Sequence, residues 1–74
     1  MKHMTTREAI EFLVREGMSM YRIAKTLRVA PISVSNYRYG DNKMGLVTAA
    51  RFEELFNIVI TDAARPGRKA DENN

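Results

Sequence analysis

The sequence predicts an all-α protein, a small bundle of four to five short helices with or without a short extended segment near the C-terminus. Three observations support this fold class. Apolar residues recur at helical spacing in several short stretches. Capping residues, glycines and a proline separate these stretches. The chain has 74 residues and no cysteine, so it forms one small core that no disulfide reinforces, and a partner subunit is the natural source of further stability.

The first predicted helix covers about residues 6–16. Thr5 and Glu8 have the spacing of a capping box, in which each side chain accepts a hydrogen bond from the other residue's backbone amide. Apolar residues follow at helical spacing, and Gly17 suits a left-handed position after the helix. Residues 1–4 are expected to be a disordered N-terminus or a remnant of cloning.

Two short helices are predicted in the middle of the chain. Ser19 is a favourable N-cap for the first of them, and Pro31 opens the second, because the first turn of a helix does not need the missing N–H of proline. The second runs to about residue 39, and its apolar stripe is narrow, with only Val34 and Tyr37. It is therefore predicted to have one packed edge and one edge that is offered to a ligand. The helix that follows Ser19 has a wider apolar stripe, formed by Met20, Ile23, Ala24 and Leu27.

A fourth helix is predicted at about residues 46–56, after a loop signal at 40–45. Ile58-Val59-Ile60 is too short for a choice between helix and strand. Residues 62–74 are predicted to be a flexible basic tail, so that the folded domain covers residues 5–61. The fourth helix is expected to bury some combination of Leu46, Ala49, Ala50, Phe52, Leu55 and Phe56.

Positive charge is concentrated in the middle of the chain. The formal net charge is +3. Residues 19–44 contain five basic residues against Asp41 alone, a local balance of +4, whereas residues 45–62 are net acidic. Such a block is typical of a surface that faces phosphates.

The segment from Met20 to Tyr37 resembles the helix-turn-helix unit of the Cro and phage-repressor family. Ala24 is small at the point where the two helices of this unit cross, and Val29 fills the turn between them. Val34 and Tyr37 stand where the family anchors its second helix to the core. The unit covers residues 20–39 of this chain.

Two positions depart from the family pattern. Arg28 stands where the family prefers a glycine in the left-handed conformation, and an arginine there costs about 1 kcal/mol relative to glycine. Met20 replaces the family's glutamine at the start of the first helix of the unit. Ser19 and the helix N-terminus are then expected to supply the phosphate contact at that end.

The resemblance implies a small transcriptional repressor that binds double-stranded DNA, with the recognition helix 31–39 in the major groove. Asn36 can pair with adenine and Ile32 can pack on a thymine methyl group, while an ordinary solvated helix face is the alternative. The candidate base contacts are Ile32, Ser33, Ser35 and Asn36. The candidate phosphate contacts are Ser19, Tyr21, Arg22, Lys25, Arg28, Arg38, Tyr39 and Lys43.

One recognition helix contacts too few base pairs to single out a site in a genome, so a homodimer on a palindromic operator is expected. Its expected interface is the apolar C-terminal part of the domain. The alternative is that Ile58 and Ile60 cover the core of their own chain. The candidate interface residues are Phe52, Phe56, Ile58, Val59 and Ile60.

The sequence contains no recognisable catalytic set. His3 is the only histidine, no cysteine nucleophile is present, and no glycine-rich phosphate loop occurs. We therefore expect no enzyme activity, cofactor, metal, small-molecule ligand or membrane partner, and a location in the cytoplasm of a bacterial or phage-infected cell. The alternative function is a protein-binding regulator, antitoxin-like or RNA-polymerase-binding, that reuses the same fold.

Overall fold

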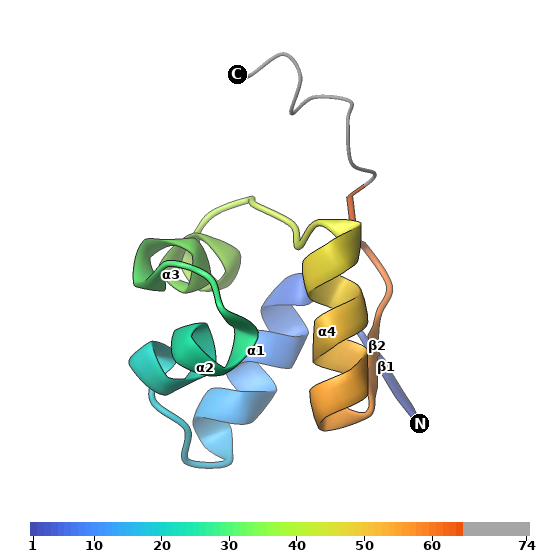
Figure 1. The fold of residues 1–74 in the computed structure, drawn as a ribbon, viewed down its shortest axis with the longest axis horizontal. Helices are drawn as coiled ribbons and strands as arrows, with labels where there is room; N and C mark the ends of the chain where they lie inside the picture. Colours follow the sequence, from blue (N-terminus) through green and yellow to red (C-terminus); the bar gives the residue numbers. More distant parts are fainter. Residues whose placement is uncertain (65–74) are drawn as a thin grey trace.

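A computed structural model describes residues 1–64 of the chain (Figure 1). The fold is mostly helical, as the sequence predicts, and each of the four predicted helices is present within about one residue of its expected bounds. A short two-stranded sheet is added to the helices, so the class is not purely α. The elements are β1 (Lys2–Met4), α1 (Thr6–Arg15), α2 (Met20–Leu27), α3 (Pro31–Tyr39), α4 (Leu46–Phe56) and β2 (Ile58–Ile60).

Local hydrogen bonds fix both ends of α1. Thr5 Oγ1 accepts from the Glu8 amide at 3.2 Å, and the Thr5 amide donates to Glu8 Oε1 at 3.0 Å, which confirms the predicted capping box. Beyond the helix, Gly17 has a φ of +104°, and the Met18 amide donates back to the Leu13 carbonyl at 3.0 Å. A residue with a side chain is strained in this conformation, which explains the glycine.

The turn between α2 and α3 ends α2 in the same way, but with an arginine in the left-handed position. Arg28 has φ 63° and ψ 43°. Its amide donates to the Lys25 carbonyl at 3.2 Å, and the Val29 amide donates to the Ala24 carbonyl at 3.0 Å. Val29 also packs against the core. These bonds satisfy carbonyls at the end of α2 and hold α3 in a fixed position relative to it.

Replacing Arg28 with glycine is expected to stabilise the fold by about 0.5–1 kcal/mol, because glycine removes the strain of a left-handed residue that has a Cβ atom. Urea denaturation followed by circular dichroism measures the change. Arg22→Gly is the matched control: it removes the same charge inside α2, where glycine costs about 1 kcal/mol. A lower stability for Arg28→Gly would mean that the turn is not left-handed in solution.

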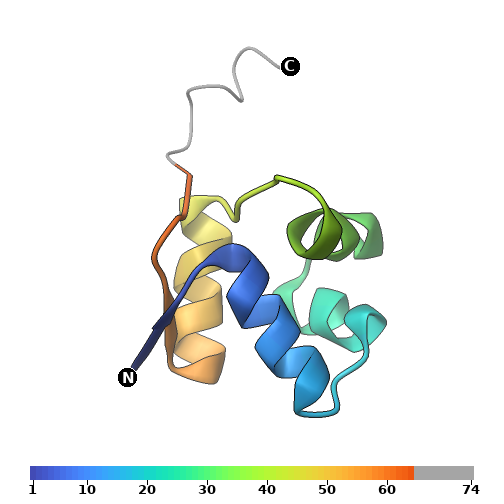
Figure 2. The ribbon, with the colours of Figure 1, turned by 180° about the vertical axis from the view of Figure 1, so that it is seen from behind.

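The N-terminal residues are ordered, which corrects the expectation that residues 1–4 are disordered. Lys2–Met4 form β1, which pairs in parallel with β2 in the register Lys2↔Ile58, His3↔Val59 and Met4↔Ile60 (Figure 2). The Thr61 amide also donates to the Met4 carbonyl at 2.9 Å. The physical reason is that β2 packs along α4, and its remaining backbone groups need a partner, which β1 supplies.

The core fills the space between the four helices and β2. Phe52 is completely buried, and its ring centroid lies 4.8 Å from that of Phe56. Ile58 and Ile60 are buried as well, whereas Val59 points outward and is half-exposed. Phe52, Ile58 and Ile60 thus belong to the core of their own chain and are not available as the expected dimer interface. No helix within residues 1–64 is both long enough and apolar enough to cross a membrane.

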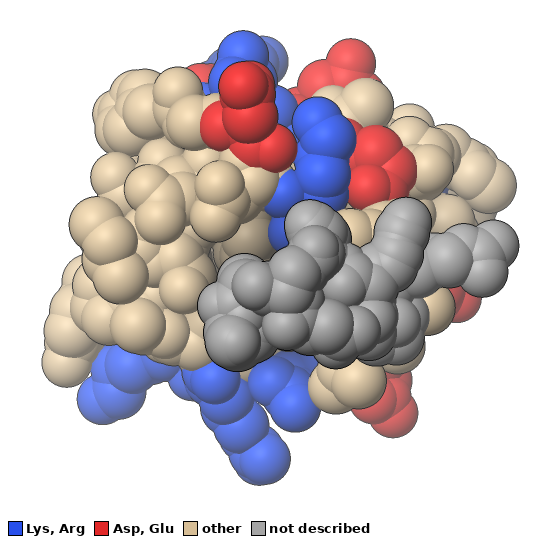
Figure 3. Space-filling view, turned by 90° about the horizontal axis from the view of Figure 1, so that it is seen from above, with Lys and Arg blue, Asp and Glu red and all other residues tan. Residues whose placement is uncertain are grey.

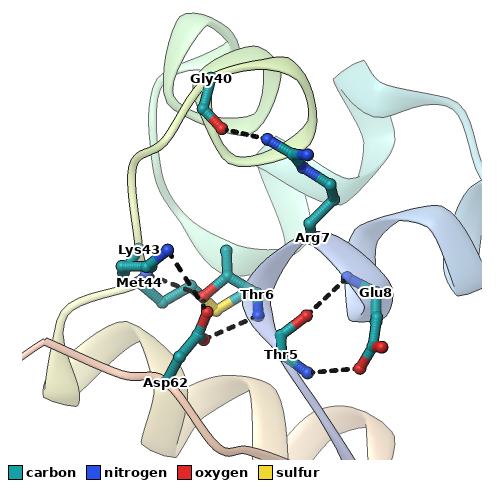
Figure 4. A network of polar contacts seen from close by, with 8 residues as sticks. All are labelled: Thr5, Thr6, Arg7, Glu8, Gly40, Lys43, Met44 and Asp62. Carbon is teal, nitrogen blue, oxygen red and sulfur yellow. Dashed lines mark hydrogen bonds and ion pairs between the residues drawn. The ribbon is translucent and has the colours of Figure 1, made fainter.

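A partly buried polar cluster closes the fold beside the N-terminus of α1 (Figure 4). The Thr6 amide and the Thr6 hydroxyl both donate to Asp62 Oδ1 at 2.8 Å, and the Met44 amide donates to Thr6 Oγ1 at 3.1 Å. Arg7 Nη2 also donates to the Gly40 carbonyl at 2.7 Å. Asp62 is therefore fixed to the domain and does not begin a flexible tail. Residues 65–74 of the predicted tail lie outside the described residues.

Candidate nucleic-acid interface

Helix α3 exposes one row of uncharged side chains. Ile32, Asn36 and Tyr39 are separated by four and three residues, which places them on the same side of the helix. All three are exposed, and the Ile32 side chain is 64% accessible although it is apolar. Ser33 and Ser35 are half-buried beside this row. The four candidate base contacts thus lie on the accessible side of α3 or at its border.

The opposite side of α3 is packed against the core. Val34 is fully buried and Tyr37 nearly so, and α3 contacts both α1 and α2. Burial raises the pKa of the Tyr37 phenol above its usual value, and a hydrogen bond from Thr48 offsets part of this change. Tyr37 therefore remains a neutral phenol at physiological pH and serves as an anchor for α3.

Arg38 connects α3 to the two preceding helices. Its Nε lies 3.1 Å from Glu11 Oε2 on α1, and its Nη1 lies 3.3 Å from the Met20 sulfur on α2. Its guanidinium also lies over the Tyr39 ring, 5.0 Å from the centroid. The Arg38 side chain is mostly buried, so these contacts hold α3 in place and leave little of the group for a phosphate.

Three other cations are more accessible. Arg22, Lys25 and Arg28 are exposed, and within residues 1–64 none of them has a carboxylate at salt-bridge distance. Tyr21 is exposed beside them, with Lys25 Nζ 5.8 Å from its ring centroid. These groups come from α2 and the turn that follows it. Lys43 differs from them, because its Nζ lies 3.9 Å from Asp62 Oδ2.

The N-terminus of α2 is capped by Ser19 and remains accessible to an anion. Ser19 Oγ accepts from the Arg22 amide at 3.1 Å, which leaves its hydroxyl hydrogen available to a ligand. The first turn of α2 has no acidic residue. The positive end of the helix dipole therefore lies at the surface next to Arg22.

On the face seen in Figure 3, the surface over α3 is uncharged, and charged side chains lie along its upper and lower edges. In Figure 3 the left part of the molecule, over α3, has neither acidic nor basic side chains. Basic side chains project from the lower edge of this view, and acidic and basic side chains alternate along the upper edge. An uncharged surface with cations along one edge is compatible with base contacts in its centre and phosphate contacts at that edge.

One residue that positions the α2–α3 pair was not found from the sequence. Arg51 Nη1 on α4 donates to the Leu27 carbonyl, which is one of the unsatisfied carbonyls at the end of α2. This contact joins residues 24 positions apart, and no local sequence pattern indicates it. It fixes α2 to α4 and so stabilises the turn at Arg28.

Comparison with protein-family models, curated proteins and solved structures finds no match for this chain. Within the described residues, no three histidine, cysteine or acidic side chains are grouped so that they can hold a metal ion. The interpretation of the surface therefore depends on the chemistry of α2, α3 and the turn between them.

Proposed function

We propose that this chain is a small sequence-specific DNA-binding protein, a Cro-like transcriptional repressor that acts in the cytoplasm of a bacterial or phage-infected cell. In this proposal α2, the turn at residues 28–30 and α3 form a helix-turn-helix unit, and α3 enters the major groove of double-stranded DNA. Two observations carry the proposal: α3 exposes a row of uncharged side chains, and Arg22, Lys25 and Arg28 form no ion pair within residues 1–64.

The side chains of the row have the chemistry that base recognition needs. The Asn36 carboxamide can donate to and accept from one adenine at the same time, and Ile32 can cover a thymine methyl group. An isoleucine that is 64% exposed on a polar helix gains free energy when such a partner covers it. Tyr39 extends the row toward the end of α3.

The cations around the row have the complementary role. Arg22, Lys25 and Arg28 are proposed to contact phosphates and to release counterions, which gives affinity without sequence preference. The open N-terminus of α2 at Ser19 adds one backbone site for a phosphate. Arg38 is assigned to positioning of α3, because Glu11 and Met20 already occupy its guanidinium.

Two substitutions test this division of roles. Asn36→Ala is expected to lose discrimination at one base pair by about 1–3 kcal/mol, while nonspecific affinity stays close to that of the unchanged protein. Arg22→Ala is expected to weaken binding to all sequences and to reduce the slope of log K against log salt by about one unit. Fluorescence anisotropy with a selected duplex and single-base variants of it measures both effects.

Arg15→Ala is the matched control, because Arg15 is an exposed cation at the end of α1, outside the proposed interface. It is expected to leave both the specificity and the salt slope close to those of the unchanged protein. If Asn36→Ala and Arg22→Ala also leave DNA binding unchanged, α3 is not a recognition helix.

A further inference from the structure

Helix α4 carries an apolar face that nothing in the described chain covers. Leu46 and Val47 are 44% and 68% exposed, and Ala50 is exposed as well. Their separations of one, three and four residues place them together on the N-terminal half of one side of α4. The opposite side of the helix holds Ala49 and Phe52 in the core. The exposed side, with Leu46, Val47, Ala50, Glu53 and Glu54, is called the outer face of α4 below.

The charges on this outer face oppose the helix dipole. Glu53 and Glu54 are exposed in the last turn of α4, which has no basic residue, although a helix C-terminus favours cations. The first turn has no acidic residue, and its N-cap, Gly45, makes no side-chain hydrogen bond. Lys43 lies three residues before α4, with its Nζ 3.9 Å from Asp62 Oδ2. The acidic last turn is unfavourable for the helix dipole, and the first turn lacks the acidic residue that would be favourable there.

We propose that the partner of this face is a second copy of the same chain, with the two α4 helices packed antiparallel around Ala50. In that arrangement Glu53 and Glu54 of each copy lie beside the first turn and Lys43 of the other. The acidic last turn of each α4 then lies beside the positive N-terminal end of the other, and a dyad makes the two contacts identical. Leu46 and Val47 are covered by the partner helix, including the methylene groups of its glutamates.

Ala50 suits the crossing point of two such helices. Its methyl group lets the backbones approach closely, and the larger residues of the face lie one turn away on either side of it. The proposal differs from the interface expected from the sequence, of which Phe52, Ile58 and Ile60 are in the core, whereas Phe56 and Val59 are half-buried. The use of this dimer to bind a two-part operator rests on the proposed function. The contact between the two copies can be measured without DNA.

Opposite charges at position 47 give a direct test. Sedimentation equilibrium without DNA is expected to show a monomer–dimer equilibrium for the unchanged chain. Val47→Glu places a carboxylate beside the partner's Glu53 and Glu54, and is expected to weaken the dimer by about tenfold or more. Val47→Lys removes the same apolar side chain but pairs with those glutamates, and is expected to weaken the dimer clearly less than Val47→Glu.

For the stability of α4 itself, Val47→Glu is expected to be better than Val47→Lys, which is the opposite of the order expected for the dimer. An effect on the interface can therefore be distinguished from an effect on folding. A glutamate in the first turn is favourable for the dipole and has Arg51 four residues later, whereas a lysine there is unfavourable on both counts. Val47→Glu is therefore expected to keep or raise the thermal stability of the monomer. Adding Glu53→Lys and Glu54→Lys to Val47→Glu is expected to restore dimer formation. Leu55→Glu, at an exposed position of α4 outside the outer face, is the control and is expected to leave the equilibrium unchanged.

A monomer at a concentration of several hundred micromolar, or equal dimer constants for Val47→Glu and Val47→Lys, would overturn the proposal. Failure of the proposed DNA binding gives a different result, because the duplex is then not bound while the DNA-free dimer constants still follow the charge at position 47. A dimer that ignores all of these substitutions would place the contact between copies elsewhere.

Discussion

Phe52→Ala is expected to lower the free energy of unfolding by about 3–5 kcal/mol, because it removes a large side chain from the core. The Phe52 side chain is completely buried, and it makes an aromatic contact with Phe56 at 4.8 Å. A domain of this size has only about 4–11 kcal/mol of stability in total, at roughly 0.05–0.15 kcal/mol per residue. The variant is therefore expected to lose a large share of its stability and to melt at a clearly lower temperature.

Thermal denaturation followed by circular dichroism measures this effect. Leu55→Ala is the matched control, because Leu55 lies on the same helix but is about half exposed, and its loss is expected to cost less than 1 kcal/mol. If Phe52 instead formed a contact between subunits, its removal would change the oligomeric state and leave a folded monomer. A folded Phe52→Ala variant with a near-normal melting temperature would contradict the burial seen here.

Thr6→Val is expected to destabilise the fold by about 2–4 kcal/mol, although valine and threonine have nearly the same shape. The substitution removes the hydroxyl that donates to Asp62 and that accepts from the Met44 amide. The loss of a hydrogen bond to a charged group and the burial of an unpaired amide each contribute to this cost. Thr6 is almost completely buried, so water does not replace the lost partner.

Urea denaturation of Thr6→Val and Thr6→Ser separates the hydroxyl from the methyl group. Serine keeps both hydrogen bonds and loses only one methyl, so it is expected to cost about 1 kcal/mol. Equal losses for valine and serine would show that packing, and not the contacts to Asp62 and Met44, determines the stability at this site. The cluster of Figure 4 would then have a smaller role than its geometry indicates.

The helices were predictable from the sequence because their signals are local. The capping box of Thr5 and Glu8, the N-cap at Ser19 and the proline at position 31 each act within one turn, and all three are present as expected. The left-handed conformation of Arg28 is confirmed as well. These features required no knowledge of which segments meet in space.

The contacts between distant segments were not predictable in the same way. β1 pairs with residues 56 positions away, and Asp62 binds the Thr6 amide across an equal separation. Neither contact leaves a periodic pattern, so residues 1–4 and 62–64 were wrongly expected to be disordered and flexible. The dimer interface was equally hard to predict. The apolar character of Ile58 and Ile60 does not indicate whether they are buried in the core of their own chain or by a partner.

The exposed side of α3 was predictable from the sequence, whereas the ion pairs of the surrounding cations were not. The narrow apolar stripe of Val34 and Tyr37 indicates which side of α3 is exposed, and the structure agrees with it. The sequence shows where the cations are concentrated but not which of them form ion pairs. Arg38 and Arg22 are therefore equal candidates for phosphate contacts in the sequence, and only the structure shows that Glu11 forms an ion pair with Arg38.

Selection of binding sites from a pool of random duplexes, followed by titration of the enriched duplex at several salt concentrations, tests the central claim most directly. The proposed function predicts enrichment of one sequence, bound at least about 10³-fold more tightly than unrelated DNA, with an affinity that falls steeply with salt. The absence of any enriched sequence, together with no salt-dependent binding to the pool, would contradict it and favour a protein-binding regulator.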